Sequence, residues 1–346
     1  MAVDEAPPFW WRKNAWQAWL LAPIGIAYGK AAQKRMEQAP TAEVPVPVIC
    51  VGNFIVGGAG KTPTVQMLSR FARSKGLRPG VLTRGHGGAV TTPTVVNREK
   101  HNSHDVGDEA LLHARHAVTV VSADRARGAE MLMEKGCDVI LMDDGFQNPV
   151  LKKDFNLVVV DAKRGLGNGF PVPAGPVRVP FRDQVKHADA VLVIGEGNGG
   201  DQVIRRCARS GKPVFLANIL PTGINKLSDP QYFAYAGIGD PEKFFETLEN
   251  GGVQIAGRES FGDHHVFTDL ECEDLMEKAE KLEATLITTA KDAVRLAKRG
   301  KAQEKLLDAS EVLHITLDAD DPNMLQRILS VAEERCDQRR LAMAKS

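Results

Sequence analysis

The stretch GNFIVGGAGKTPT, at residues 52–64, follows an apolar run and constrains the fold more than any other part of the sequence. Three of the four residues 57–60 are glycines, and Lys61 and Thr62 follow directly. The free N–H groups of such a loop, at the start of a helix, bind phosphate, while the lysine reaches the β- and γ-phosphates and the threonine hydroxyl holds Mg²⁺. The predicted ATP-binding residues are Ile55, Val56, Gly57, Gly58, Ala59, Gly60, Lys61 and Thr62.

The strict form of this motif is G-x-x-x-x-G-K-[ST], and its first glycine falls at Ile55 in this chain. The flanking segments nevertheless favour a phosphate loop. An apolar run at 46–52 predicts a buried strand, and 61–75 predicts a helix. Pro63 costs little there, because a proline in the first turn has no N–H partner to lose. Strand, glycine-rich loop and helix in this order predict a P-loop rather than an ordinary turn.

Apolar strands and helices alternate along the rest of the chain. Buried strands are predicted at 80–85, 117–122, 138–144 and 155–162, then at 189–195, 212–219, 232–239, 285–290 and 312–317. Continuous apolar strands indicate a parallel sheet that is covered on both faces. The predicted fold class is therefore α/β: a P-loop NTPase-type parallel sheet flanked by helices, a second, smaller α/β domain and an N-terminal membrane-associated helix.

Changes in composition predict how the chain is divided. The segment 164–180 is rich in glycine and proline, which indicates a structured loop near a domain junction. The predicted parts are a membrane-associating aromatic helix at 1–38, a P-loop domain at 39–184, a second α/β domain at 185–320, and a C-terminal helix at 321–346 that packs on either domain.

All four tryptophans, Trp10, Trp11, Trp16 and Trp19, lie near the N-terminus, and residues 14–29 carry no charge. A helix of this length measures about 24 Å, short of the roughly 30 Å hydrocarbon core of a bilayer. Tryptophan favours the headgroup layer and basic residues bracket the stretch, so we predict a helix that lies on, or dips into, the cytoplasmic leaflet. The alternative is a helix packed on the protein's own core or on a second subunit.

The overall charge gives no support to a nucleic-acid partner. The 44 Lys and Arg residues balance the 44 Asp and Glu residues, so the chain has no global basic field. The 5 cysteines are far apart and form no C-x-x-C pair, which fits a reducing compartment and neither a disulfide framework nor a zinc site. We therefore expect packing cysteines and no nucleic-acid partner.

Two adjacent acids, Asp143 and Asp144, end an apolar strand, at the position of the acid that holds Mg²⁺ in P-loop enzymes. Successive side chains of a strand point to opposite faces. We therefore expect one acid to contact the metal and the other to hold the following loop or a water ligand. The sequence leaves open which of the two does so.

A second acidic group, Asp105, Asp108 and Glu109, stands where a helix is predicted to begin. Acids are common in a first turn because they cap the helix and suit its dipole, but a carboxylate here is equally suited to accept the proton of an attacking hydroxyl. His264 and His265 pose the same choice between loop residues and a proton-relay partner from the second domain. The residues alone do not decide between these interpretations.

Taken together, these motifs resemble the tetraacyldisaccharide 4'-kinase family of lipid A biosynthesis. The resemblance rests on VPVICVGNFIVGGAGKTPT, TRGHGG, VGDEALL, SADR, MDDGFQ, GLGNGFPVPAGPVR, GIGDPEKFF, FGDHHVFT and TTAKDAVRL, which follow the family's order. It covers nearly the whole chain after residue 45. The chain departs from the family at His86, where RGYGG is usual, and at Ala110, where GDEP is usual. Neither departure touches the phosphate-handling groups.

The resemblance implies a kinase that uses ATP and Mg²⁺ to phosphorylate the 4'-hydroxyl of the lipid A disaccharide precursor, at the cytoplasmic side of the inner membrane. It implies that Asp108 is the catalytic base, that His264 tunes this base, and that Lys61 acts on the phosphates. The implied metal-site residues are Thr62, Glu109, Asp143 and Asp144. The implied substrate-lining residues are Arg84, Arg125 and Gln147.

Two other functions stay open on the sequence alone. One is a soluble small-molecule P-loop kinase whose N-terminal helix belongs to the core. The other is a P-loop switch protein that binds nucleotide to change partners and has no phosphoryl acceptor. Vesicle binding distinguishes the first of these, and acceptor-stimulated ATP consumption distinguishes the second. The sequence predicts neither the acyl-chain preference nor the oligomeric state.

Overall fold

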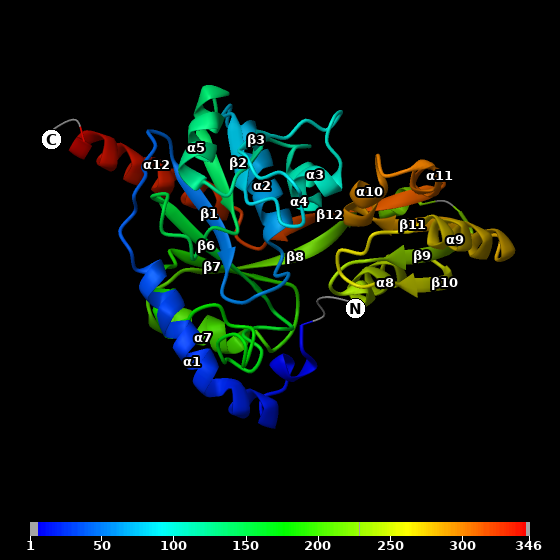
Figure 1. The fold of residues 1–346 in the computed structure, drawn as a ribbon, viewed down its shortest axis with the longest axis horizontal. Coiled ribbons are helices and arrows are strands. Elements are labelled where there is room, and N and C mark those ends of the chain that lie inside the picture. Colours follow the sequence, from blue (N-terminus) through cyan, green and yellow to red (C-terminus); the bar gives the residue numbers. More distant parts are fainter. Residues whose placement is uncertain (1–5, 228, 344–346) are drawn as a thin grey trace.

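The computed structural model describes residues 6–227 and 229–343, and one mixed sheet runs through this part of the chain (Figure 1). Its strands follow the order β10-β9-β11-β12-β8-β7-β6-β1-β5-β2-β4-β3. The strands are β1 (Val48–Asn53), β2 (Pro79–Thr83), β3 (Thr94–Val95), β4 (Val118–Val121), β5 (Val139–Asp143), β6 (Phe155–Asp161), β7 (Ala190–Ile194), β8 (Val214–Thr222), β9 (Tyr232–Ala236), β10 (Ile255–Ser260), β11 (Thr285–Thr289) and β12 (Ser310–Ala319).

The helices cover both faces of this sheet (Figure 1). The α-helices are α1 (Trp16–Met36), α2 (Lys61–Ser74), α3 (Ser103–Val106), α4 (Asp108–His113), α5 (Arg125–Glu134), α6 (Phe181–His187), α7 (Asp201–Arg209), α8 (Pro241–Asn250), α9 (Asp269–Lys281), α10 (Ala290–Leu296), α11 (Lys301–Asp308) and α12 (Met324–Met343). Two short 3₁₀ helices in the described chain are η1 (Pro8–Trp11) and η2 (Ile224–Lys226).

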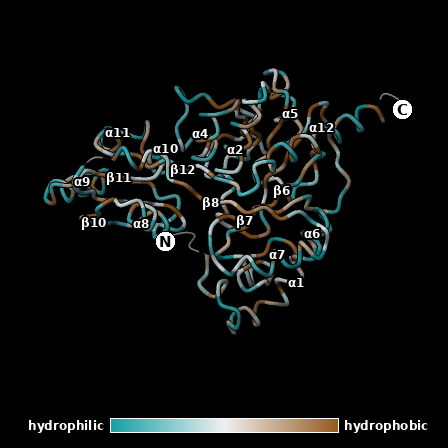
Figure 2. The backbone as a smooth tube through the Cα atoms, turned by 180° about the vertical axis from the view of Figure 1, so that it is seen from behind, coloured by the Kyte–Doolittle hydropathy of each residue, from teal (hydrophilic) through white to brown (hydrophobic). Residues whose placement is uncertain are grey.

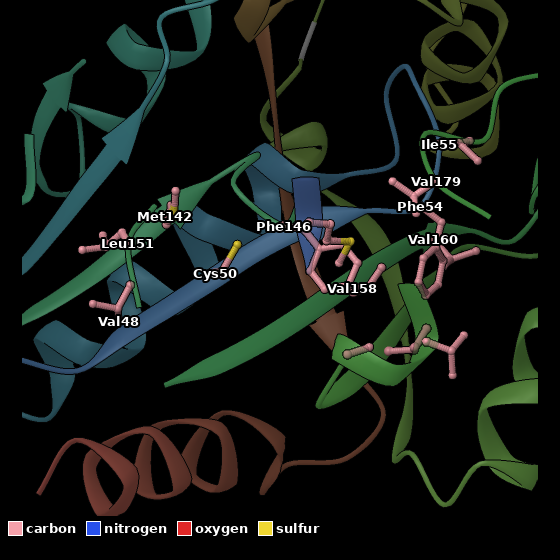
Figure 3. Packing of buried hydrophobic residues seen from close by; sticks show 14 of the residues in the cluster. Val48, Cys50, Phe54, Ile55, Met142, Phe146, Leu151, Val158, Val160 and Val179 are labelled. Atoms are coloured by element: carbon pink, nitrogen blue, oxygen red, sulfur yellow. The ribbon is translucent and has the colours of Figure 1, made fainter. Parts of the chain in front are cut away.

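The larger unit, residues 6–222 and 314–343, is built on the parallel strands from β8 to β4. Every residue of β1 is buried, and its side chains alternate between two cores. Val48 and Cys50 face one core, shown in Figure 3, while Ile49 and Val51 face the other. Burial on both faces explains why these strands read as continuous apolar runs. The structure thus confirms the predicted α/β fold with a large, mostly parallel sheet flanked by helices.

The larger unit extends beyond residue 185, where the sequence division places a boundary. β7 pairs in parallel with β6, beginning at Leu157 and Ala190, and β8 pairs in parallel with β7, beginning at Val191 and Val214. Both strands contribute to the same two cores as β1. That boundary therefore falls inside one continuous sheet, because the change in loop composition at 164–180 does not interrupt the strand pairing.

The C-terminal helix α12 packs on the larger unit. Met324, Ile328 and Ala332 are buried in the core that also contains Ile49. Near the other end of the helix, Arg339 forms a buried ion pair with Asp154, with Nη2 and Oδ2 2.9 Å apart. These contacts answer the question that the sequence left open, whether the last helix packs on the first or the second domain.

The smaller unit, residues 229–313, continues the same sheet through β11, β9 and β10. β9 alternates between two further cores, with Phe233 and Tyr235 on one side and Tyr232 and Ala234 on the other. Helices α9 and α11 cover the first core and α8 covers the second (Figure 1). In Figure 2 the brown, hydrophobic stretches lie along the central strands, and the teal stretches include the outer helix α9.

A two-stranded ribbon joins the two units. β12 runs antiparallel to β8 from His314 opposite Thr222 to Ala319 opposite Ala217, and its first half pairs in parallel with β11. The same strand therefore belongs to both halves of the sheet. This ribbon brings the loops of the smaller unit close to α4 of the larger unit, where the candidate site lies.

The N-terminal helix α1 docks on the glycine- and proline-rich loop. A Cβ placed at Gly25 would lie 2.7 Å from Pro171 O, so the helix approaches the loop closely on its small-residue face. Trp10, predicted to face a membrane, is instead buried, and its Nε1 donates to Pro173 O at 3.0 Å. The opposite face of α1 exposes large apolar side chains such as Trp16. No helix in the described part of the chain has the length and apolar character needed to cross a bilayer.

Candidate active site

The loop between β1 and α2 has the conformation of a phosphate cradle. Gly57 and Gly60 have φ angles of 105° and 89°, which glycine adopts without strain. A side chain at residue 60 would also clash, because its Cβ would lie 2.6 Å from Ile194 Cδ1. Beyond the adjacent residues, nothing in the described chain lies within 4 Å of a Cβ placed at Gly57 or Gly58. The loop backbone is therefore open to a phosphate at these positions.

Ile55 shows why the loop lacks the first glycine of the strict motif. This residue is buried and forms an isolated antiparallel bridge with Val177. Next to it, Val56 N donates to Pro176 O at 2.8 Å, and Arg178 Nε donates to Ile55 O at 3.0 Å. The glycine- and proline-rich segment thus holds the first half of the loop in place. A packed isoleucine is compatible with this extended, bridged conformation, which needs no glycine.

Lys61 folds back over the loop. Its Nζ lies 3.4 Å from Gly57 O and 3.8 Å from Asp144 Oδ1. Asp144 Oδ2 also accepts a hydrogen bond from Arg178 Nη2 at 2.9 Å. Burial would raise the pKa of the Asp144 carboxyl, but the charges of Lys61 and Arg178 outweigh it and lower the pKa. Lys61 and Arg178 therefore both lie beside the loop, where their charges could also pair with the oxygens of a bound phosphate.

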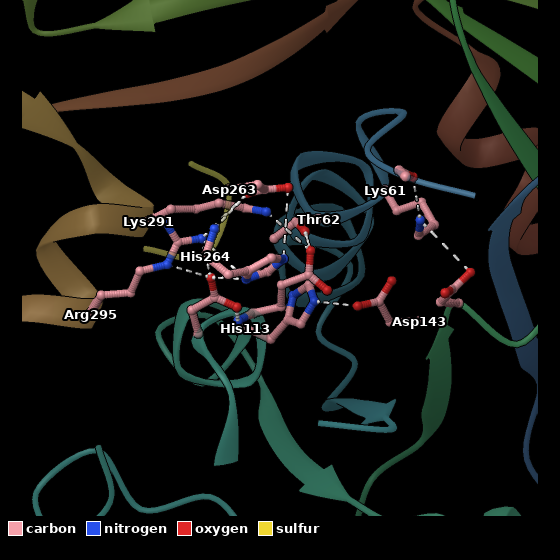
Figure 4. Close-up of polar contacts among 12 residues, drawn as sticks. Lys61, Thr62, His113, Asp143, Asp263, His264, Lys291 and Arg295 are labelled. Atoms are coloured by element: carbon pink, nitrogen blue, oxygen red, sulfur yellow. Dashed lines mark hydrogen bonds and ion pairs between the residues drawn. The ribbon is translucent and has the colours of Figure 1, made fainter. Parts of the chain in front are cut away.

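The sequence predicts that Asp143 and Asp144 point to opposite faces of one strand, but only Asp143 belongs to β5. β5 ends at Asp143, and Asp144 follows in a left-handed conformation with a φ of 51°. This turn takes Asp144 to Lys61, while Asp143 Oδ2 lies 3.0 Å from Nε2 of the buried His113 (Figure 4). The assumption that both acids lie on the strand is therefore wrong.

The two acids nevertheless fit a magnesium ion. Oδ1 of Asp143 and Oδ1 of Asp144 are buried, and neither has a hydrogen-bond partner in the described chain. Mg²⁺ retains several waters and phosphate ligands, so one or two carboxylates are enough to hold it. Buried carboxylate oxygens without donors match this chemistry. No set of three or more His, Cys, Asp or Glu side chains in the described chain is arranged to hold a metal by itself.

Thr62 links the phosphate loop to α4 and to the smaller unit. Its Oγ1 donates to Glu109 Oε1 at 3.0 Å, and Lys291 Nζ donates to the same oxygen at 3.2 Å (Figure 4). Burial would raise the pKa of Glu109, but the charges of Lys291 and Lys61 lower it. Glu109 is therefore an ionised acid beside the threonine hydroxyl that the sequence assigns to the metal site.

Asp108 begins α4 and is 4% exposed. Its Oδ2 accepts from Arg295 Nη2 at 2.6 Å and from Nε at 2.9 Å, and lies 3.3 Å from His264 Nδ1. Its Oδ1 accepts from the backbone N–H of Glu109 at 2.8 Å. Burial would raise the pKa of Asp108, but the hydrogen bond from His264 and the charges of Arg295 and Lys291 hold it well below its usual range. The structure thus brings Asp108 and His264 together from the two units (Figure 4).

The segment TTAKDAVRL is part of the family resemblance, but Lys291 and Arg295 are not among the predicted site residues. Both project from α10, four residues apart and hence on one face of the helix. The Arg295 guanidinium is fixed by Asp292 Oδ1 at 3.0 Å from Nη1 and by the carbonyl of Gly237. Asp292 in turn accepts a hydrogen bond from the hydroxyl of Thr289, the N-cap of the same helix. The sequence does carry a signal for these residues, because Lys291 and Arg295 are two cations spaced to lie on one face of a helix. They pair with the two adjacent acids, Lys291 with Glu109 and Arg295 with Asp108.

This arrangement has a counterpart among known proteins. Residues 17–333 match the model of the family described as tetraacyldisaccharide-1-P 4'-kinase. The chain belongs to this family.

Relatives of this 4'-kinase family match over nearly their full length. The tetraacyldisaccharide 4'-kinase of Agrobacterium fabrum is 48% identical over 98% of this chain and 97% of its own length. That of Sinorhizobium fredii is 50% identical over 92% of each chain. The crystal structure of LpxK from Aquifex aeolicus in complex with ATP has a TM-score of 0.70 and 25% identity, and covers 91% of this chain and 99% of its own.

In this member of the 4'-kinase family, His264 Nδ1 has two neighbours. It lies 3.3 Å from Asp108 Oδ2 and 3.3 Å from Arg295 Nη2. Nδ1 cannot donate to the carboxylate and accept from the guanidinium at once, and the negative charge of Asp108 favours a proton on Nδ1. The hydrogen bond to Asp108 accordingly raises the pKa of His264 against the effect of burial. The ring of His86 packs edge-on against His264, with centroids 5.6 Å apart, so His86 supplies an aromatic contact here.

The contact between Asp108 and His264 predicts a pH-dependent difference in stability between the wild type and His264→Gln. A histidine whose pKa is raised by folding adds stability below its unfolded pKa of about 6.5, and this contribution is lost as the pH rises through the folded pKa. We therefore expect the Tm difference to be largest at about pH 6 and to shrink in alkaline buffer. Thermal unfolding of both proteins across this range measures it.

The matched control for this prediction is His265→Gln. His265 Nε2 lies 3.0 Å from Glu271 Oε2, and its ring stacks on Phe261, so it contacts α9 rather than Asp108. A Tm difference for His264→Gln that does not change with pH would show that His264 carries no added charge in the folded protein.

The three predicted substrate-lining residues lie in different settings. Arg125 is 4% exposed and its Nη1 donates to Ser122 O at 3.1 Å. Gln147 Nε2 donates to Asn53 O at 2.8 Å, which supports the end of β1. Arg84, directly after β2, is exposed. Arg84 therefore presents its side chain to the surroundings, whereas Arg125 holds the turn between β4 and α5 and Gln147 holds the end of β1.

Proposed function

We propose that this chain transfers the γ-phosphoryl group of ATP to the 4'-hydroxyl of a tetraacylated disaccharide 1-phosphate in lipid A biosynthesis. Membership in the 4'-kinase family supports this function, and the site holds the groups that it needs. The observation that carries it is the contact between Asp108 and His264. Asp108 directly precedes Glu109, and Glu109 accepts the hydrogen bond of Thr62 on the phosphate loop. The pair of Asp108 and His264 is therefore next to the predicted ATP site.

In the proposed reaction, the acceptor oxygen forms a bond to the γ-phosphorus, while the bond from this phosphorus to the β–γ bridging oxygen breaks. The electron pair of that bond leaves with ADP, and the hydroxyl proton passes to the Asp108 carboxylate. His264 Nδ1 lies 3.3 Å from the same carboxylate, and its hydrogen bond lowers the pKa of Asp108, so His264 orients and tunes the base. A positioned base contributes about 10²- to 10⁴-fold to such a step.

The loop N–H groups and Lys61 are placed to neutralise the phosphate charge, which is the main task in phosphoryl transfer. Thr62, Glu109, Asp143 and Asp144 are the residues placed to hold Mg²⁺. When bound, the ion would add positive charge beside the β- and γ-phosphate oxygens.

Incubation with ATP labelled in the γ-phosphate tests this function directly. With the disaccharide 1-phosphate as acceptor, we expect the label at the 4' position of the sugar and little ATP consumption without acceptor. ATP consumption that is independent of the acceptor would instead favour a nucleotide switch protein. Preferential labelling of a water-soluble acceptor would favour a soluble small-molecule kinase.

We also propose that α1 attaches the protein to the cytoplasmic face of the inner membrane. Trp16, Leu20 and Ile24 recur every fourth residue along one face of the helix and are 69%, 70% and 60% exposed. The opposite, small-residue face docks on the protein. An acylated acceptor does not leave the bilayer cheaply, because each exposed CH₂ costs about 0.8 kcal/mol. An apolar helix face at the surface would bring the site to that acceptor.

We expect the triple variant in which serine replaces Trp16, Leu20 and Ile24 to bind anionic vesicles less well. Its partition coefficient, measured by co-sedimentation, should fall by at least about 100-fold. Each such side chain contributes about 1.5 to 3 kcal/mol when it enters an apolar phase. The matched control is Leu270→Ser, which removes an apolar side chain of the smaller unit that is 78% exposed. Unchanged vesicle binding of the triple variant would show that α1 is not the membrane contact.

A further inference from the structure

We propose that Lys291, carried by the smaller unit, contacts the γ-phosphate of bound ATP and is a catalytic residue of the phosphoryl transfer. This inference rests on the proposed function, since it assigns a role within the same site. It gives the smaller unit a direct part in handling the nucleotide, in addition to the histidine that it contributes.

The position of the ammonium group is the first support. Lys291 Nζ and Thr62 Oγ1 share a single acceptor atom, Glu109 Oε1, at 3.2 Å and 3.0 Å. In P-loop enzymes the lysine and threonine at this position of the loop lie beside the β- and γ-phosphates. The ammonium therefore lies at the γ-phosphate end of the loop. Lys61 approaches the same loop from the side of Asp144, with Nζ 3.8 Å from Asp144 Oδ1.

The unused donors of Lys291 are the second support. An ammonium group has three N–H donors. Within the described chain, Lys291 Nζ donates one hydrogen bond, to Glu109, and its side chain is 31% exposed. Arg295 differs, because its guanidinium is 6% exposed and binds Asp108, Asp292 and the Gly237 carbonyl. Of the two cations on α10, Lys291 is the one with donors left for a ligand.

The charge and the anchoring of Lys291 are the third support. Its ammonium forms an ion pair with Glu109, with Nζ and Oε1 3.2 Å apart, so a positive charge faces the site. The helix that carries it is fixed at its first turn by the Thr289 cap and by the ion pair of Asp292 with Arg295. A flexible four-carbon stem on a fixed helix lets the charge follow a phosphate over a short distance.

The chemistry gives this cation a specific task. As the acceptor oxygen bonds to the γ-phosphorus and the bridging oxygen departs with its electron pair, negative charge is shared among the γ-phosphate oxygens and the leaving ADP. A cation supplied from a second structural element stabilises this charge in many phosphoryl-transfer enzymes. Lys291 can stabilise this charge if its ammonium donates to a γ-phosphate oxygen in addition to, or in place of, Glu109.

Nucleotide binding tests this assignment without relying on turnover. For Lys291→Gln we expect the preference for a non-hydrolysable ATP analogue over ADP, measured as the ratio of Kd values by calorimetry with Mg²⁺, to fall about 10- to 100-fold. ADP has no γ-phosphate, so its Kd should stay within about 2-fold of the wild type. The variant Lys291→Arg keeps the charge and should retain most of the preference.

The matched control is Lys298→Gln. Lys298 lies just after α10 and its Nζ donates to Arg98 O, so it also joins the two units, but through a carbonyl away from the acids. We expect it to leave both Kd values unchanged. Equal affinity losses for the ATP analogue and ADP in a folded Lys291→Gln protein, or no loss for either, would overturn the proposal. If the Kd ratio falls while the wild type fails to phosphorylate the disaccharide, the γ-phosphate contact holds and the lipid acceptor is the part that is wrong.

Discussion

Replacing Asp108 with asparagine is expected to lower kcat by about 10²- to 10⁴-fold, the loss that follows removal of a positioned base. Arg295 and His264 both reach Asp108 from the smaller unit, so this carboxylate is one of the points where the two units meet. Its lowered pKa keeps it ionised at every pH suited to the assay, so the loss should not depend on the buffer. Phosphorylation of the disaccharide at saturating ATP measures the effect.

Asparagine is a better test than alanine at this position. Alanine leaves the buried Arg295 guanidinium with no acceptor at residue 108 and only Asp292 as a close ion-pair partner in the described chain, and breaking a buried ion pair costs about 3 to 5 kcal/mol. Asparagine keeps the shape and one oxygen acceptor. Glu99→Gln, which changes an exposed acid upstream of the same helix, is the matched control and should retain normal turnover. Near-normal kcat in a folded Asp108→Asn protein would refute the role of Asp108 as the base.

The strands around the phosphate loop are predictable because burial on both faces leaves a plain sequence signal. β1, β5 and β7 are buried at every position, and each appears in the sequence as an uninterrupted apolar run. β3 and β10 carry no such signal. β3 has only two residues, and β10, with the sequence IAGRES, is partly exposed along its length. Pairing with a neighbouring strand, rather than local sequence, defines both.

The acids of the site are predictable for a related reason, since each stands next to a strand end or helix start that the sequence marks. Their cationic partners are not. Asp108 and Arg295 are 187 residues apart, and their contact depends on how the β8–β12 ribbon sets the smaller unit against α4. Residue type limits which charges are available, but only the folded chain pairs them.

The tryptophans near the N-terminus show that residue type alone does not predict whether an aromatic side chain is buried or exposed. Tryptophan is enriched both at membrane interfaces and at buried sites where its N–H finds a partner, so the same residue type fits either place. Trp10 is a buried tryptophan whose N–H donates to Pro173 O, whereas Trp16 is exposed on α1. Periodicity distinguishes them: Trp16 shares its helix face with Leu20 and Ile24, and Trp10 precedes the helix.

Replacing Lys61 with alanine is expected to lower kcat by at least about 10²-fold, because it removes a preorganised charge at the site of phosphoryl transfer. Lys61 is the first residue of α2, where the helix dipole already favours an anion. Its Nζ lies over the loop, 3.4 Å from Gly57 O, next to backbone that is open to a phosphate. Steady-state turnover at saturating ATP and acceptor measures the loss.

The Lys61→Ala protein should fold, because Asp144 retains its hydrogen bond to Arg178 at 2.9 Å once the lysine is gone. An unchanged Tm would therefore assign the loss of turnover to catalysis. Lys75→Ala is the matched control: Lys75 ends the same helix, with its ammonium 5.2 Å from the centre of the Phe71 ring, and it should leave kcat unchanged. If Lys61→Ala retained kcat within about 3-fold of the wild type, the loop would not be neutralising charge in the transition state, and the assignment of this turn as the γ-phosphate site would fail.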